Sequence, residues 1–143
     1  MADRTPDPPL PLLVVDAANV VGSVPDGWWR DRRAAAARLR DALAPLAARG
    51  LAAADRVPKW ATEGPLDIRM VVEGAARDLP GVPGVHVTGA PGSGDDEIVR
   101  LVAAEHASDP TRPCLVVTAD RELRSRVGEF GAVVSGPHTL PRR

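Results

Sequence analysis

The sequence predicts an α/β domain in which parallel strands alternate with helices. Short, continuous apolar runs recur along the chain, as in strands buried on both faces of a parallel sheet. Segments with apolar residues at helical spacing lie between several of these runs. The length of 143 residues suits one domain with a single core. Crossover connections between parallel strands place helices on both faces, so we expect a three-layer domain with a central, mostly parallel sheet.

The first predicted elements are a strand and a helix. Residues 12–15 form an apolar run that ends at Asp16, and this run is the first strand. We interpret Asp26 as the cap of a helix that starts near Trp28. The apolar stripe of this helix comprises Ala36, Leu39, Leu43 and Leu46.

Proline and glycine interrupt the chain after this stripe. Pro45 is expected to kink or divide the helix, and Gly50 lies close to its end. Residues 52–67 contain further proline and glycine and are predicted to form a loop.

The next two strands are residues 68–72, which end at Glu73, and residues 85–88. A helix is predicted from Asp95, because three apolar residues recur there at helical spacing: Ile98, Leu101 and Val102.

The last elements are a strand, a helix and a strand. Residues 114–117 are the fourth strand, and a short helix that contains Leu123 and Val127 follows. Residues 132–135 are the fifth strand. We therefore predict a flexible leader over residues 1–10, one domain over residues 11–137 and a tail over residues 138–143.

Composition excludes several classes of protein. The chain has 18 Lys and Arg against 19 Asp and Glu, so any basic surface for nucleic acid must be local. Cys114 is the only cysteine, which excludes an internal disulfide and a thiolate zinc site. The amino-terminal apolar run is interrupted at Asp16, unlike a signal peptide or a membrane span. We predict a cytoplasmic protein with no membrane partner.

Acidic residues follow the predicted strands. Asp16, Glu73 and Asp120 come at or just after the ends of three strands. Residues 95–97 (Asp-Asp-Glu) open a helix after another strand. The carboxyl ends of parallel strands meet at one edge of a sheet, where ligands bind. Clustered carboxylates repel one another unless a hard divalent cation neutralises them, so we predict Mg²⁺ or Mn²⁺ at this edge. Such an ion can activate water against a phosphodiester.

Each acid also has a structural interpretation. Residues 95–97 can cap a helix and complement its dipole, and Asp120 can cap the next helix. Glu73 beside Gly74 fits a turn residue better than a catalytic one. Asp16, with Asn19 three residues later, is harder to explain by packing. The convergence of all four segments on one edge favours a shared site.

Three motifs resemble a known family. They are residues 16–22 (Asp-Ala-Ala-Asn-Val-Val-Gly), 94–99 (Gly-Asp-Asp-Glu-Ile-Val) and 118–123 (Thr-Ala-Asp-Arg-Glu-Leu). Together and in this order they resemble the NYN domain family, in particular its YacP-like branch within the PIN-like nuclease superfamily. The second strand departs from the branch, because Glu73-Gly74 replaces the usual aspartate.

The resemblance implies a Rossmann-like, PIN-like fold and a divalent-metal ribonuclease. It also implies four catalytic metal ligands: Asp16, Asp95, Asp96 and Asp120. Asp95 is the favoured member of its pair, because Ile98 should turn that side of the helix toward the core. Asn19 would hold the first loop and Thr118 would orient Asp120.

Arginines and tryptophans are the candidate contacts to single-stranded or loop RNA. Arg121, Arg124 and Arg33 are the candidate phosphate-binding residues, and a solvated helix face is the alternative. An exposed Trp28 or Trp29 could stack on an unpaired base, although at least one of the two should belong to the core. Homodimerisation is a further possibility for this class of domain.

The predicted function is hydrolysis of RNA phosphodiester bonds at a carboxylate-held Mg²⁺ or Mn²⁺ site. The alternative is a catalytically degenerate module that binds RNA or a protein partner. A metal-dependent phosphatase or a DNA-specific nuclease would use the same chemistry.

Overall fold

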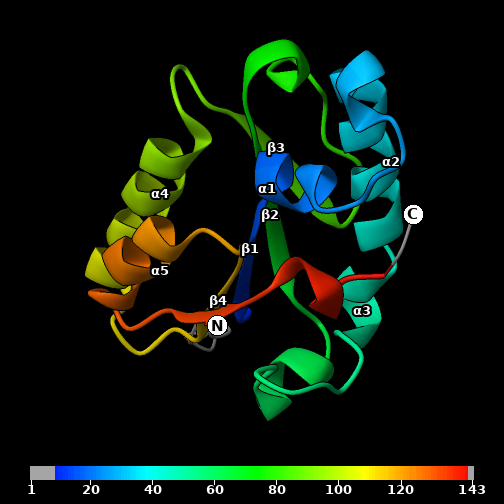
Figure 1. The fold of residues 1–143 in the computed structure, drawn as a ribbon. Coiled ribbons are helices and arrows are strands. Elements are labelled where there is room, and N and C mark those ends of the chain that lie inside the picture. Colours follow the sequence, from blue (N-terminus) through cyan, green and yellow to red (C-terminus); the bar gives the residue numbers. More distant parts are fainter. Residues whose placement is uncertain (1–8, 142–143) are drawn as a thin grey trace, which may run out of the picture.

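A five-stranded sheet runs through the centre of the computed structural model, which describes residues 9–141 (Figure 1). Its strands are β1 (Leu12–Asp16), β2 (Asp67–Val72), β3 (Val85–Gly89), β4 (Cys114–Val117) and β5 (Val133–Ser135). Their order is β3-β2-β1-β4-β5, and every neighbouring pair is parallel. This confirms the predicted α/β class, with the first strand at the centre of the sheet.

Helices cover both faces of this sheet (Figure 1). They are α1 (Ala17–Gly22), α2 (Arg32–Leu43), α3 (Leu46–Arg49), α4 (Gly94–Ser108) and α5 (Arg121–Gly128). Four 3₁₀ turns complete the described structure: Trp28–Arg30, Lys59–Thr62, Gly74–Ala76 and Pro137–Thr139. α4 and α5 lie on one face, and α1 and α2 lie on the other.

Alternation along β1 divides the core between these faces. Leu13 and Val15 pack with α1 and α2, whereas Leu12 and Val14 pack with α4 and α5. Successive side chains of a strand point to opposite faces, so an entirely apolar strand serves both layers. The predicted buried stripe of α4, residues Ile98, Leu101 and Val102, is confirmed.

The chain between β1 and α2 differs from the prediction. Helix α1 begins directly after Asp16, where we expected a loop. The predicted cap at Asp26 is wrong for α2, which begins at Arg32 and is capped by Asp31. The Asp31 carboxylate accepts a hydrogen bond from the Ala34 amide at 2.9 Å. A 3₁₀ turn over Trp28–Arg30 separates Asp26 from this helix.

Pro45 divides the following helix, as predicted. α2 ends at Leu43 and α3 begins at Leu46. Gly50 ends α3 with a φ of 84°, a conformation that glycine adopts readily. The predicted loop over residues 52–67 contains the 3₁₀ turn Lys59–Thr62 and the start of β2.

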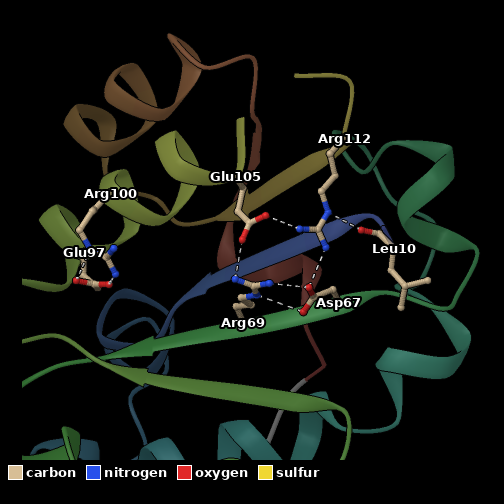
Figure 2. Close-up of polar contacts among 7 residues, drawn as sticks. All are labelled: Leu10, Asp67, Arg69, Glu97, Arg100, Glu105 and Arg112. Atoms are coloured by element: carbon tan, nitrogen blue, oxygen red, sulfur yellow. Dashed lines mark hydrogen bonds and ion pairs between the residues drawn. The ribbon is translucent and has the colours of Figure 1, made fainter. Parts of the chain in front are cut away.

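An ion-pair network closes the amino edge of the sheet, away from the strand ends that carry acids (Figure 2). Arg112 bridges Asp67 and Glu105, with Nη–O distances of 2.8 Å to each. Arg69 contacts the same two acids at 3.0 and 2.9 Å. Arg112 also donates to the Leu10 carbonyl at 2.7 Å. The network joins the starts of β1, β2 and β4 to α4.

The described chain packs almost to its end, since Leu140 is buried. Residues 1–8 of the predicted leader and residues 142–143 of the predicted tail lie outside the described residues. Within residues 9–141, no helix combines the length and the apolar character that crossing a membrane requires.

Candidate active site at the carboxyl edge of the sheet

Three polar side chains follow the central strands on one face of the sheet. Asp16, Glu73 and Thr118 each come two positions after a valine that packs beneath α4 and α5. Because strand side chains alternate, all three are directed toward this face. The first turns of α4 and α5 begin above the same edge.

Asp16 is a buried carboxylate, with 3% of its surface exposed. Its Oδ2 accepts a hydrogen bond from the Thr118 hydroxyl at 2.9 Å. Burial raises the pKa of Asp16 to about 6, and the charges of Asp95 and Glu73 add to this effect. The Thr118 hydroxyl and the Asn19 backbone amide oppose it. Asp16 therefore lies within reach of other acids and retains a proton more readily than a solvated aspartate.

Thr118 connects Asp16 to Asp120. While its hydroxyl donates to Asp16, the same oxygen accepts a hydrogen bond from the Asp120 amide at 3.1 Å. Thr118 has no exposed surface, so this connection is shielded from water. The Asn19 side chain accepts from the Ala119 amide at 2.8 Å and ties α1 to the same segment. Both residues hold the backbone around the two aspartates.

Asp120 caps α5. Its Oδ1 accepts a hydrogen bond from the Leu123 amide at 3.0 Å, so the capping interpretation holds. A carboxylate has a second oxygen, and Asp120 also acts electrostatically on Asp95. Capping of α5 by Asp120 is therefore compatible with a role in an acidic cluster, by which we mean Asp16, Glu73, Asp95 and Asp120.

The adjacent acids Asp95 and Asp96 face different surroundings. Burial raises the pKa of Asp95, and the charges of Asp120, Glu73 and Asp96 raise it further, against the opposing charge of Arg126. Asp96 is exposed and pairs with Arg126 at 3.0 Å. The cap of α4 comes from Ser93, which accepts from the Asp96 amide at 3.2 Å. Asp95 is thus the member of the pair that belongs to the cluster.

Glu73 points at the start of α4. A Cβ atom added at Gly94 would lie 3.2 Å from the Glu73 Oε1, so the carboxylate occupies the space beside this glycine. A helix start attracts negative charge. Glu97 faces elsewhere: it is buried and forms an ion pair with Arg100 (Figure 2).

The cluster offers only carboxylate oxygens, which are the ligands that Mg²⁺ and Mn²⁺ favour. Burial is the main cause of the raised pKa values of Asp16 and Asp95, and the charges of neighbouring acids add to it. As the side chains stand, however, no three His, Cys, Asp or Glu residues among residues 9–141 form a group that could hold a metal ion. These carboxylates are the type of ligand that a divalent cation prefers. In this structure, however, their side chains are not arranged around a common ion position.

The candidate RNA-binding arginines differ in their availability. Arg121 and Arg124 lie exposed on α5, and neither forms an ion pair within the described part of the chain. Arg33 pairs with Asp78 at 3.1 Å on the surface. The guanidinium of Arg32 lies 5.4 Å from the centre of the Trp28 ring.

An all-parallel five-stranded sheet between two helical layers matches the PIN-like class of folds. Within this class, the chain is similar to the crystal structure of Rae1 (YacP) from Bacillus subtilis. The likeness has a TM-score of 0.62 and covers 90% of this chain and 70% of the other, with 17% sequence identity. No protein-family model and no curated protein matches the chain. The comparison therefore supports a YacP-like fold.

Proposed function

We propose that this chain is a metal-dependent ribonuclease, with Asp16, Asp95 and Asp120 as the ligands of Mg²⁺ or Mn²⁺. The observation that carries the proposal is electrostatic. Acids from three separate segments meet at one edge of the sheet, and their mutual repulsion contributes to the raised pKa values of Asp16 and Asp95. The order of the three acidic motifs, which resembles the YacP-like branch, supplies the choice of RNA as substrate.

The residues would divide the work as follows. A bound divalent ion would supply an activated water and stabilise charge on the phosphodiester. Asp16, Asp95 and Asp120 would provide its oxygen ligands. Thr118 would hold Asp16 and the Asp120 backbone in a fixed relation, as its two hydrogen bonds indicate. Arg121 and Arg124 would attract the phosphate backbone.

Substituting the acids tests this proposal. Asp16→Asn and Asp120→Asn should abolish Mn²⁺-dependent cleavage of a single-stranded oligoribonucleotide, since each removes a ligand charge but preserves shape. Asp41→Asn, at an exposed carboxylate on α2, is the matched control and should cleave like the wild type. Full cleavage by both Asp16→Asn and Asp120→Asn would refute the assignment.

A second candidate is a catalytically degenerate module that binds RNA or a protein partner. The observation in its favour is that, within residues 9–141, no group of three potential ligands is arranged to hold an ion. This candidate predicts RNA binding that persists in EDTA, with no cleavage of any substrate. Metal-dependent hydrolysis would exclude it, and parallel assays with single-stranded DNA and a phosphate ester would test the related hydrolases.

A further inference from the structure

A cavity of about 300 Å³ lies across the carboxyl edge from the acidic cluster. Ala17, the residue after Asp16, lines it together with Val72, at the end of β2, and Glu73. These residues place it on the side of the sheet that α1 and α2 cover. The cavity and the acidic cluster therefore share one edge of the sheet and lie on its two faces, and Glu73 borders both.

Trp28 forms one wall of this cavity, and its neighbours restrict its ring. The Trp28 and Trp29 rings form a T-shaped contact, with 6.1 Å between their centroids and an angle of 88° between their planes. A Cβ atom added at Gly22 would lie 3.7 Å from the Trp28 ring. Arg32 covers part of the ring and also lines the cavity. Trp28 thus contributes an aromatic surface, partly covered by Arg32, to a cavity that small apolar residues line.

We propose that this cavity takes one unpaired nucleobase of the RNA strand whose phosphate lies at the acidic cluster. The proposal rests on the proposed function for the choice of RNA. A flat aromatic base can stack on an indole ring, and the surrounding alanines leave room for it. A base within a duplex is paired and stacked on both sides, so only single-stranded or loop RNA can supply the occupant.

Charge at the mouth of the cavity fits the same occupant. Arg32 is exposed and its guanidinium lies over the Trp28 ring, so the side chain can move aside for an inserted base and contact the phosphate that follows this base. The chain has a net charge of −1, so RNA must be attracted by local cations of this kind. An apolar side chain of a protein partner would gain nothing from this cation.

Filling the cavity tests the proposal. Ala18 is exposed and lines the cavity, so Ala18→Leu should fill it without disturbing the core. Ala104→Leu, at an exposed position of α4, is the matched control. The measurement is the affinity of each protein, in EDTA, for a single-stranded oligoribonucleotide and for versions of it with one abasic position.

Loss of base stacking should weaken binding to Ala18→Leu by roughly 5- to 150-fold, with no change for Ala104→Leu. One abasic position should weaken binding to the wild type by a similar factor and should have little further effect on Ala18→Leu. Equal affinities of the two leucine variants, or no binding of RNA by the wild type, would overturn the proposal. Equal affinities would leave the cavity to a protein side chain.

Mn²⁺-dependent cleavage, measured in parallel, separates this inference from the proposed function. Base-dependent binding that Ala18→Leu removes supports the cavity assignment even if the wild type cleaves nothing. Cleavage by the wild type with identical RNA affinities of the two leucine variants overturns the cavity assignment and leaves the ribonuclease. Melting temperatures of both variants verify that each is folded.

Discussion

Asp16 carries an energetic cost that the fold alone does not require. A carboxylate with 3% exposure loses most of its hydration, and the hydrogen bonds from the Thr118 hydroxyl and the Asn19 backbone amide compensate for only part of this loss. Nearby Asp95 and Glu73 add repulsion. Residues that reduce stability in this way concentrate at functional sites.

The raised pKa of Asp16 has a predicted consequence for stability. Between pH 3.8 and about 6 the folded protein holds a proton that the unfolded chain releases, so the free energy of unfolding falls as pH rises. Above this range the charged Asp16 lowers the free energy of unfolding by an amount on the order of 3 kcal/mol. Asp16→Asn should therefore be more stable than the wild type at neutral pH in EDTA, and its advantage should shrink toward acidic pH.

Urea denaturation of both proteins across this pH range measures the difference. If the free energies of unfolding of the two proteins differed by the same amount at acidic and neutral pH, the raised pKa of Asp16 would be contradicted. Adding Mn²⁺ should stabilise the wild type and have less effect on Asp16→Asn, because a ligand that binds only the folded state raises its stability.

Thr118→Val should expose the role of the shared hydroxyl. Without this donor the pKa of Asp16 should rise further, because the Thr118 hydrogen bond lowers it. Cleavage should fall roughly 10- to 100-fold, and its pH profile should move to higher pH. Thr118→Ser keeps the hydroxyl and should restore both. An unchanged Asp16 titration by NMR in Thr118→Val would contradict this role, whether or not the protein cleaves RNA.

At the scale of elements, helix α2 depends on its cap at Asp31. The loop before α2 contains two aspartates, and only the geometry distinguishes them: Asp31 accepts from the Ala34 amide. Asp31→Ala should lower the free energy of unfolding by about 1 kcal/mol. Asp31→Asn should retain most of the wild-type stability, because asparagine also caps helices well. Asp41→Ala, within the same helix, is the control. Equal stability of Asp31→Ala and the control in urea would show that the cap contributes nothing.

The strands were predictable because their signal is local and strong. Each is a continuous apolar run, and all five lie where the sequence indicated. Helix α1 was not predictable, because six residues directly after a strand offer little helical periodicity. Whether Asp26 or Asp31 caps α2 depended on the 3₁₀ turn between them, and no short sequence pattern predicted this turn.

Contacts between distant segments were beyond the sequence. The acids could be assigned to one edge, because topology alone brings strand ends together. The surroundings of individual side chains could not be predicted. The pairing of Asp96 with Arg126 and of Arg33 with Asp78, for example, depends on how the helices pack. The cavity beside Trp28 depends on the same packing and was equally invisible.

At the scale of the whole molecule, the two edges of the sheet have opposite electrostatics. At the amino edge, burial would raise the pKa of Asp67, but Arg69 and Arg112 outweigh it and hold the pKa below its usual value. Asp67 therefore contributes stability above the unfolded-state pKa of 3.8, and this contribution is lost as pH falls through its folded-state pKa. The amino edge supports the fold, whereas the carboxyl edge weakens it.

Arg112→Met should destabilise the protein strongly. It leaves Asp67 and Glu105 short of a partner in a network where the Arg112 side chain is only 7% exposed. We expect a loss of about 2 kcal/mol, less than for a fully buried pair. The loss should diminish at acidic pH as Asp67 becomes protonated.

Arg33→Met, which breaks an exposed pair with Asp78, is the control and should change stability by less than about 0.5 kcal/mol. Urea denaturation at neutral and acidic pH compares the two variants. A loss in Arg112→Met no larger than in this control would show that the network does not support the fold.

The central place of β1 in the sheet bears on how the protein is made. Both neighbours of this strand come much later in the chain: Leu12 is aligned with Asp67 on one side and with Cys114 on the other. A nascent chain must therefore carry this apolar strand without either partner until β2 has emerged, and without its second partner until β4 has emerged. Folding is governed by these long-range pairings and should be slow for a domain of this size. Because Asp16 meets Thr118 only when β4 docks, a partly synthesised chain cannot yet form the acidic cluster.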